Sequence, residues 1–137
     1  MPRALLPGES RLLVVEDHPQ IRLYMRGSLE SAGYEVAEAT RGLGALELLK
    51  TCPCDLILSD YVLPDMTGVD LYHRIGAQDP RFLTRFILTT GALYCPEIET
   101  LQRTGPIRVL VKPFLSEEMI QVVGDVLDRD RLTPPLF

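Results

Sequence analysis

The chain has 137 residues, about the length of one domain, which is enough to bury a core without disulfides or metals. Hydrophobic residues make up 46% and charged residues 24%, and the formal net charge is −5. Nucleic-acid-binding domains are typically basic, and a membrane-spanning helix needs a long apolar run that this sequence lacks. We therefore expect no direct binding to nucleic acid and no insertion into a membrane.

The N-terminus and the cysteines bear on the cellular compartment. Residues 1–10 contain no apolar stretch of the kind found in a secretory signal. Cys52 and Cys54 could ligate a metal, but no second pair of Cys or His stands at matching spacing. We expect free thiols in a reducing, cytoplasmic protein.

Two strands and two helices are predicted in the first third of the chain. Arg11–Val15 is a short apolar run that predicts a buried strand. His18–Ala32 carries apolar residues at helical spacing, which predicts an amphipathic helix that stops at Gly33. Tyr34–Ala39 alternates and is typical of an edge strand, and Gly44–Lys50 favours a second helix.

The middle of the chain repeats this alternation. Asp55–Ser59 predicts a central strand that ends at Asp60. A turn-rich stretch follows, and then a helix over about 69–77, which Asp79-Pro80 breaks. Arg85–Thr89 predicts the fourth strand.

The last third adds two helices and one strand. Pro96–Arg103 predicts a weak helix, and Ile107–Val111 predicts the fifth strand. Ser116 is a suitable N-cap for a final helix, which we expect to continue to about Leu127.

Strands that alternate with helices in this way indicate an α/β fold with a single, doubly wound, five-stranded parallel sheet and five helices. We expect one domain over residues 10–128. Residues 1–9 would form an N-terminal tail. Residues 129–137, which are charged and then rich in proline, would form a C-terminal tail or linker stub.

Polar residues stand at the end of four predicted strands. They are Glu16-Asp17, Asp60, Thr90 and Lys112. Ligand sites in open parallel sheets lie beyond the carboxyl ends of the strands. We therefore interpret these residues as one site.

The residue types at this edge favour a particular chemistry. Carboxylates brought together repel and raise one another's pKa unless positive charge joins them. Mg²⁺ suits a site with few carboxylates and several waters. A carboxylate nucleophile beside Mg²⁺, with Lys112 and the Thr90 hydroxyl, suits phosphoryl transfer to an aspartate.

Each residue alone has a simpler explanation. Glu16-Asp17 could be exposed acids at a helix start, where the helix dipole favours them. Thr90 could belong to a turn, and Lys112 could be a surface lysine. His18 could border the pocket, although a residue at the helix start is the simpler interpretation. Only their joint placement favours a functional site.

The sequence resembles the response-regulator receiver family of two-component signalling, the CheY-like family, over about residues 11–127. Four segments carry the resemblance, each at the end of a predicted strand. They are Leu12-Leu-Val-Val-Glu-Asp17, Asp55-Leu-Ile-Leu-Ser-Asp60 with Leu63-Pro64 and Gly68, Thr89-Thr90-Gly91, and Val109-Leu-Val-Lys-Pro-Phe114. The resemblance implies the flavodoxin-like strand order 2-1-3-4-5.

The resemblance also implies a role for the acidic residues. Asp60 would accept the phosphoryl group and become a 4-aspartylphosphate. The donor would be a phosphohistidine on a sensor histidine kinase or a phosphotransfer protein. Asp17 and Asp60 would bind Mg²⁺ together with the backbone carbonyl of Val62, and Glu16 would assist.

On the same basis, Thr90 and Lys112 would contact phosphoryl oxygens. The Lys112–Pro113 bond would be cis, as is typical in the family. Phosphorylation would change the face formed by the fourth helix, fifth strand and fifth helix, and an unidentified output protein would bind there. The resemblance also allows a homodimer through this face.

Two other functions are considered. A haloacid-dehalogenase-type hydrolase also uses an aspartate nucleophile, but it needs a second Asp two residues later, where this chain has Val62. A receiver-like interaction module without phosphorylation would have lost the acceptor, a magnesium ligand or the lysine. The chain retains all of them. Neither alternative fits as well as a phosphoacceptor switch. We expect a signalling domain rather than an enzyme that acts on other substrates.

The chain departs from the family in three respects, which involve four positions. Glu16 stands where many members have Asp, and Val109 where many have an aromatic ring that reports the switch. Val62 and Ala92 are apolar where members that lose phosphate quickly have polar groups.

The third departure predicts a long-lived phosphorylated form, because no side chain at these two positions can orient the attacking water. The measurement is the decay of the phosphorylated mass in purified protein without phosphatase. Hydrolysis within seconds would contradict this prediction.

Overall fold

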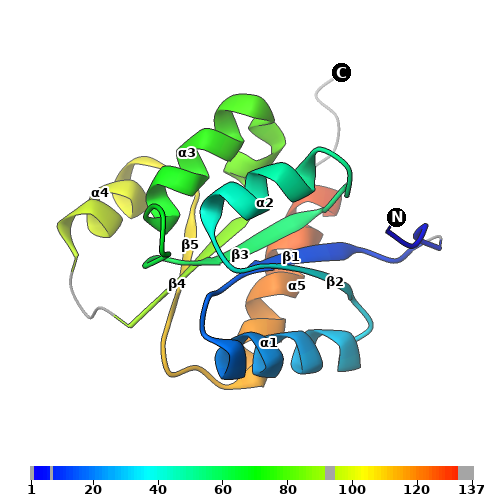
Figure 1. The fold of residues 1–137 in the computed structure, drawn as a ribbon. Coiled ribbons are helices and arrows are strands. Elements are labelled where there is room, and N and C mark those ends of the chain that lie inside the picture. The colour runs from blue at the N-terminus through cyan, green and yellow to red at the C-terminus, as the bar shows by residue number, and fades with distance from the viewer. Residues whose placement is uncertain (1, 7, 92–94, 133–137) are drawn as a thin grey trace.

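A computed structural model of the chain describes residues 2–6, 8–91 and 95–132, with side chains described as far as Asp128. It contains one five-stranded parallel sheet in the order β2-β1-β3-β4-β5 (Figure 1). The strands are β1 Arg11–Val15, β2 Glu35–Ala39, β3 Leu56–Asp60, β4 Phe86–Thr90 and β5 Arg108–Val111. Fold class and strand order are confirmed.

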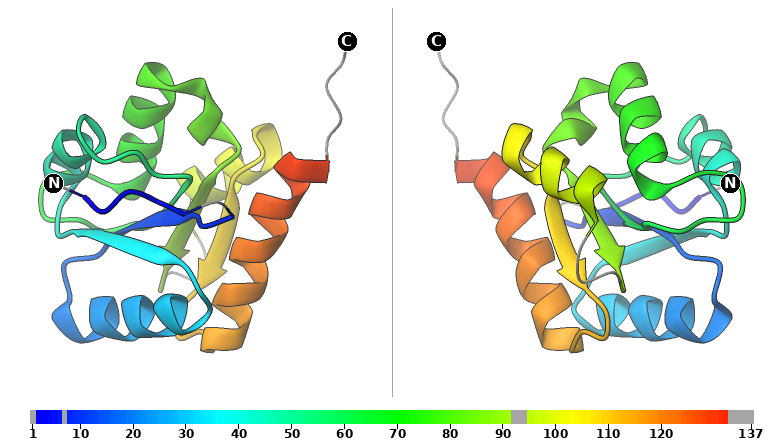
Figure 2. Two further views of the ribbon diagram at one scale, coloured as in Figure 1. Left: turned by 90° about the vertical axis from the view of Figure 1, so that its right-hand side faces the viewer. Right: turned by 90° about the vertical axis from the view of Figure 1, so that its left-hand side faces the viewer.

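Helices cover both faces of this sheet. They are α1 Pro19–Ser31, α2 Gly42–Leu49, α3 Gly68–Gln78, α4 Pro96–Thr104 and α5 Ser116–Leu132, with a short 3₁₀-helix, η1, at Pro80–Leu83. α1 and α5 lie on one face, and α2, α3 and α4 lie on the other (Figures 1 and 2). No helix in the described part of the chain is long and apolar enough to cross a membrane.

The core consists of two layers, one on each side of the sheet. Successive strand residues point to opposite faces. Leu12 and Val14 therefore pack with residues of α1 and α5, while Leu13 and Val15 pack with residues of α2 and α3. These four residues of β1 are at most 1% exposed. Burial on both faces explains why the strands have continuous apolar runs.

The strand order reverses beside β1. β1 pairs with β2 on one side and with β3 on the other. The chain therefore adds β2 on one side of β1 and then crosses back to add β3, β4 and β5 on the other side. In doubly wound folds the ligand site lies at the carboxyl ends of the strands next to this reversal, where β1 and β3 end at Val15 and Asp60.

The helix ends differ from the expectation at the C-terminus. α5 continues to Leu132, beyond the expected end near Leu127. Polar residues after 127 are compatible with a helical turn as well as with a tail, so composition alone predicted the end too early. Ser116 is the first helical residue rather than the N-cap, and the Glu118 carboxylate accepts a hydrogen bond from the Leu115 N–H. The division at 10–128 stays a prediction.

One glycine holds the start of α3 close to the end of β3. A Cβ on Gly68 would lie 2.4 Å from the carbonyl oxygen of Asp60 and 2.5 Å from Leu88 Cδ1. The Gly68 N–H also donates a hydrogen bond to the Tyr61 carbonyl at 2.6 Å. A larger residue would therefore push α3 away from the strand that carries Asp60.

We predict that Gly68→Ala lowers the free energy of unfolding by about 1–3 kcal/mol, because the added methyl group has no space. Gly27→Ala is the matched control: Gly27 is exposed in α1, and a Cβ there meets nothing within 4 Å. The control should raise stability by about 0.5–1 kcal/mol, because alanine favours the helix. Urea unfolding measures both, and equal effects of the two substitutions would contradict the prediction.

Candidate functional site

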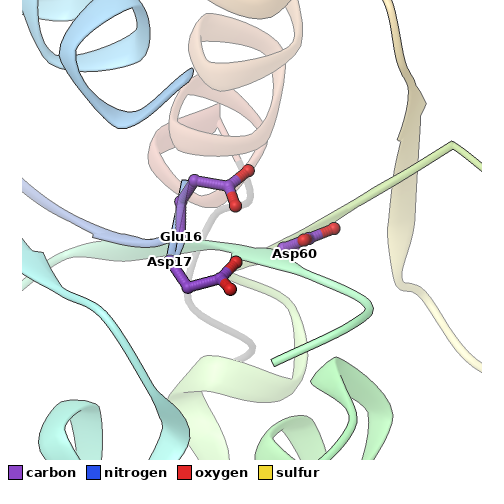
Figure 3. A group of neighbouring side chains, drawn as sticks. All are labelled: Glu16, Asp17 and Asp60. Carbon is purple, nitrogen blue, oxygen red and sulfur yellow. The ribbon is translucent and has the colours of Figure 1, made fainter. Parts of the chain in front are cut away.

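The site lies where β1 and β3 end, beside the reversal of strand order. Val15 pairs with Ser59, so Glu16 and Asp60, the next residues along each strand, are neighbours. One carboxylate oxygen from each of Glu16, Asp17 and Asp60 lies within 4.8 Å of the others. Figure 3 shows the Glu16 and Asp17 side chains extending from the end of β1 toward Asp60. The predicted acidic group is therefore present.

Lys112 closes this group on the β5 side. Its Nζ lies 2.7 Å from Glu16 Oε1 and 3.2 Å from Asp60 Oδ1. The Glu16 side chain is 1% exposed, while those of Asp60 and Lys112 are 12% and 19% exposed. Residues almost a hundred positions apart in the sequence thus form one ion-paired cluster.

Burial and charge shift the pKa values in the cluster. Burial raises the pKa of Glu16, and the Asp60 charge adds to this, although the hydrogen bond from Lys112 opposes it. Burial by itself lowers the pKa of Lys112, but the contacts with Glu16 and Asp60 outweigh it and raise the pKa. A lysine that holds its proton more firmly supplies a dependable positive charge at this point.

The β1–α1 connection is held by contacts around Glu16. The Arg22 guanidinium donates a hydrogen bond to the Glu16 carbonyl at 3.0 Å. His18 is the N-cap of α1, where its Nδ1 accepts from the Ile21 N–H at 3.4 Å. The simpler interpretation of His18 is therefore the one observed. The Arg22 contact was not predicted, since local sequence does not indicate which carbonyl an arginine reaches.

Thr90 belongs to the same edge of the sheet. It is the last residue of β4, is 3% exposed, and its carbonyl accepts a hydrogen bond from the Lys112 N–H at 2.7 Å. Ala92, which is apolar where some members of the family have a polar group, lies outside the described residues. The Lys112–Pro113 peptide bond is cis, as expected.

The β3–α3 loop carries Val62, the expected carbonyl ligand. Val62 forms an isolated bridge with Thr67, and its side chain is 67% exposed. The loop also contains Asp65, which sequence reasoning missed. Its two carboxylate oxygens accept hydrogen bonds from the N–H groups of Gly42 and Leu43, at 2.8 and 2.9 Å.

Tyr61, the residue after Asp60, reaches α4. Its hydroxyl donates a hydrogen bond to Glu97 Oε2 at 2.7 Å and accepts one from the Cys95 thiol, whose Sγ lies 3.5 Å from the Tyr61 hydroxyl oxygen. Hydrogen bonds with Cys95 and Glu97 raise the pKa of Tyr61. This contact links the residue next to Asp60 with Glu97 in the first turn of α4, 36 positions further along the chain.

The donor set fits a small, hard divalent cation. Glu16, Asp17 and Asp60 offer only oxygen ligands, which Mg²⁺ prefers. Lys112 supplies a single positive charge to the three carboxylates, so negative charge remains in excess. A cation that kept several waters would balance this charge without a complete set of protein ligands.

Comparisons with known proteins give a consistent result. The sequence profile described as the response regulator receiver domain matches residues 12–124. The response regulator receiver protein CpdR of Brucella abortus is 32% identical over 117 residues, which cover 85% of this chain and 96% of CpdR. Sensor kinase CckA of the same species is 29% identical over 126 residues, which cover 90% of this chain but 13% of CckA.

The fold is also similar to solved structures. A CheY-like response regulator receiver domain protein from Methanospirillum hungatei superimposes with a TM-score of 0.82 at 25% identity. The match covers 90% of this chain and 98% of that one.

We predict that Asp17→Asn raises the free energy of unfolding by about 0.5 kcal/mol in metal-free buffer with EDTA, a size typical of exposed charge interactions. Asp17 is exposed and close to two other carboxylates, so its neutralisation relieves repulsion. Asp125→Asn, an exposed acid on α5 that hydrogen-bonds Gln121, is the control and should change little. Urea unfolding with EDTA measures both, and a less stable Asp17→Asn would refute the repulsion.

Proposed function

Because the chain belongs to the response regulator receiver family of two-component signalling, we propose that it is a phosphoacceptor switch whose acceptor is Asp60. The observation that supports this best is the position of Lys112, whose Nζ lies within 3.2 Å of both Glu16 and Asp60. A lysine held against an acidic cluster at the strand ends is suited to phosphoryl transfer to a carboxylate.

In the proposed reaction, a carboxylate oxygen of Asp60 bonds to phosphorus as the bond from phosphorus to the donor histidine nitrogen breaks. The electron pair of that bond goes to the nitrogen. Lys112 offsets the charge that develops on the phosphoryl oxygens, and the Thr90 hydroxyl donates a hydrogen bond to one of them. Lys112 already contacts Asp60, so its charge needs little rearrangement to act.

Asp17, Asp60 and the Val62 carbonyl would hold Mg²⁺, with Glu16 assisting. When bound, Mg²⁺ supplies charge neutralisation to the phosphoryl oxygens. The tight contact between Glu16 and Lys112 supports an assisting role for Glu16, because this carboxylate is already partly neutralised.

The phosphoryl donor would be a sensor histidine kinase or a phosphotransfer protein. CckA, a sensor kinase, contains a segment similar to this chain, which supports a place in kinase signalling. The domain would extend over residues 10–128, and the protein would act in the cytoplasm.

The face formed by α4, β5 and α5 would respond to phosphorylation and bind the output protein or a second copy of the chain. Phosphorylation adds about −1.5 to −2 charges at Asp60, which biases an existing equilibrium between two arrangements. Val109 is aliphatic, so the aromatic reporter of many relatives is lacking at this position. The contact from Tyr61 to Glu97 offers another route from the acceptor to α4.

Incubation of the wild type with Mg²⁺ and acetyl phosphate should add about 80 Da, the mass of one phosphoryl group. Asp60→Asn should show no adduct, because the amide is not a nucleophile toward phosphorus. Intact-mass spectrometry measures both samples.

The control for this experiment is the wild type with acetyl phosphate and EDTA, where the adduct should be strongly reduced. An equal adduct on Asp60→Asn would place the acceptor elsewhere. No adduct on the wild type, in protein that circular dichroism reports as folded, would contradict phosphorylation by this route.

A further inference from the structure

Asp65 connects two parts of the chain that the site needs close together. It lies in the β3–α3 loop, three residues after Val62, and its carboxylate caps the N-terminus of α2. The first N–H groups of a helix have no partner within the helix. Arg41, the N-cap residue of α2, makes no side-chain cap hydrogen bond, so Asp65 supplies from a distance what the local sequence does not.

A second contact holds the loop against α2. A Cβ on Gly42 would lie 2.4 Å from Met66 Sδ, so the Met66 side chain lies directly on this glycine. Gly42 is buried, although α2 begins there. Neighbouring loop residues Asp65 and Met66 thus contact the same helix end, one through hydrogen bonds and the other through packing.

The base of the loop is closed by its own hydrogen bonds. The Leu63 N–H donates to the Met66 carbonyl at 3.2 Å, and Val62 bridges to Thr67. Gly68 N–H donates to the Tyr61 carbonyl. Movement at the tip, residues 64–66, would therefore reach Val62 through these short connections.

The charge of Asp65 suits this position. Burial by itself raises its pKa, but the hydrogen bonds from the Leu43 and Gly42 N–H groups together outweigh this and lower the pKa below its usual value. An ionised carboxylate at a helix N-terminus is also favoured by the helix dipole. The contact is thus made by the charged form.

We propose that Asp65 is a positioning residue that holds the β3–α3 loop, and with it the Val62 backbone, in place for Mg²⁺ binding. The proposal rests on the proposed function, because it assumes a cation at the acidic cluster. Asp65 itself does not touch the cation or the phosphoryl group. Its effect is to limit the freedom of the loop that follows Asp60.

The first test is the affinity for Mg²⁺, measured by calorimetric titration of the metal into metal-free protein. Asp65→Ala should weaken binding about tenfold, the lower end of the effect seen when groups that orient metal ligands are removed. Asp65→Asn, which keeps one acceptor oxygen, should give an intermediate affinity. Folded Asp65→Ala with wild-type affinity would overturn the proposal.

The matched control is Asp79→Ala. Asp79 also caps the N-terminus of a helix, because its carboxylate accepts a hydrogen bond from the Arg81 N–H in η1. It lies between the end of α3 and the start of β4. The start of β4 is at the amino ends of the strands, whereas Asp60 is at their carboxyl ends. Asp79→Ala should leave the Mg²⁺ affinity unchanged. If Asp79→Ala lost as much affinity as Asp65→Ala, the loss would reflect lower overall stability of the fold, and the proposal would be overturned.

The second test uses the metal-free protein and does not depend on phosphorylation. Amide hydrogen exchange in Asp65→Ala should be faster at Gly42 and Leu43 and also at Leu63, because the loop opens with the cap. Faster exchange at Gly42 and Leu43 alone would mean that Asp65 stabilises only α2, which overturns the positioning role. A wild type that bound no Mg²⁺ would instead refute the proposed function.

Discussion

Three carboxylates within 4.8 Å of one another dominate the local energetics of this protein. Such a group is costly in a folded chain unless positive charge joins it, and Lys112 supplies one charge from β5. The remaining excess of negative charge makes the site responsive, since a cation or a change of charge at Asp60 alters the balance. Stability is thus given up locally at the position where the proposed chemistry occurs.

The rest of the fold provides the rigidity that such a cluster requires. Glu16, Asp60 and Lys112 each follow or end a strand whose neighbours are hydrogen-bonded on a common sheet. β1 and the middle of β3 are almost completely buried on both faces, so these strands cannot shift to relieve the repulsion. Gly68 adds a close contact between α3 and the Asp60 backbone. The repulsion therefore stays concentrated at one edge.

Units similar to this chain occur in more than one setting. Receiver protein CpdR consists almost entirely of the matched region, whereas in sensor kinase CckA the match is 13% of the length. Two hydrophobic layers, each closed by helices of the same unit, explain how one fold can serve in both. The proposed switch would depend on the cluster and on the helices that contact its neighbours, such as α4 through Tyr61.

Periodicity and residue type by themselves determined the alternation of strands and helices and the polar residues at the strand ends, because both are local properties of the chain. The resemblance to the family implied the strand order and the roles proposed for the site residues. Only the tertiary structure decided which distant groups pair: Lys112 with Glu16, Asp65 with the start of α2, and Tyr61 with Glu97. A side chain reaches such partners only after the sheet has brought separate segments together, so no local sequence pattern predicts these pairs.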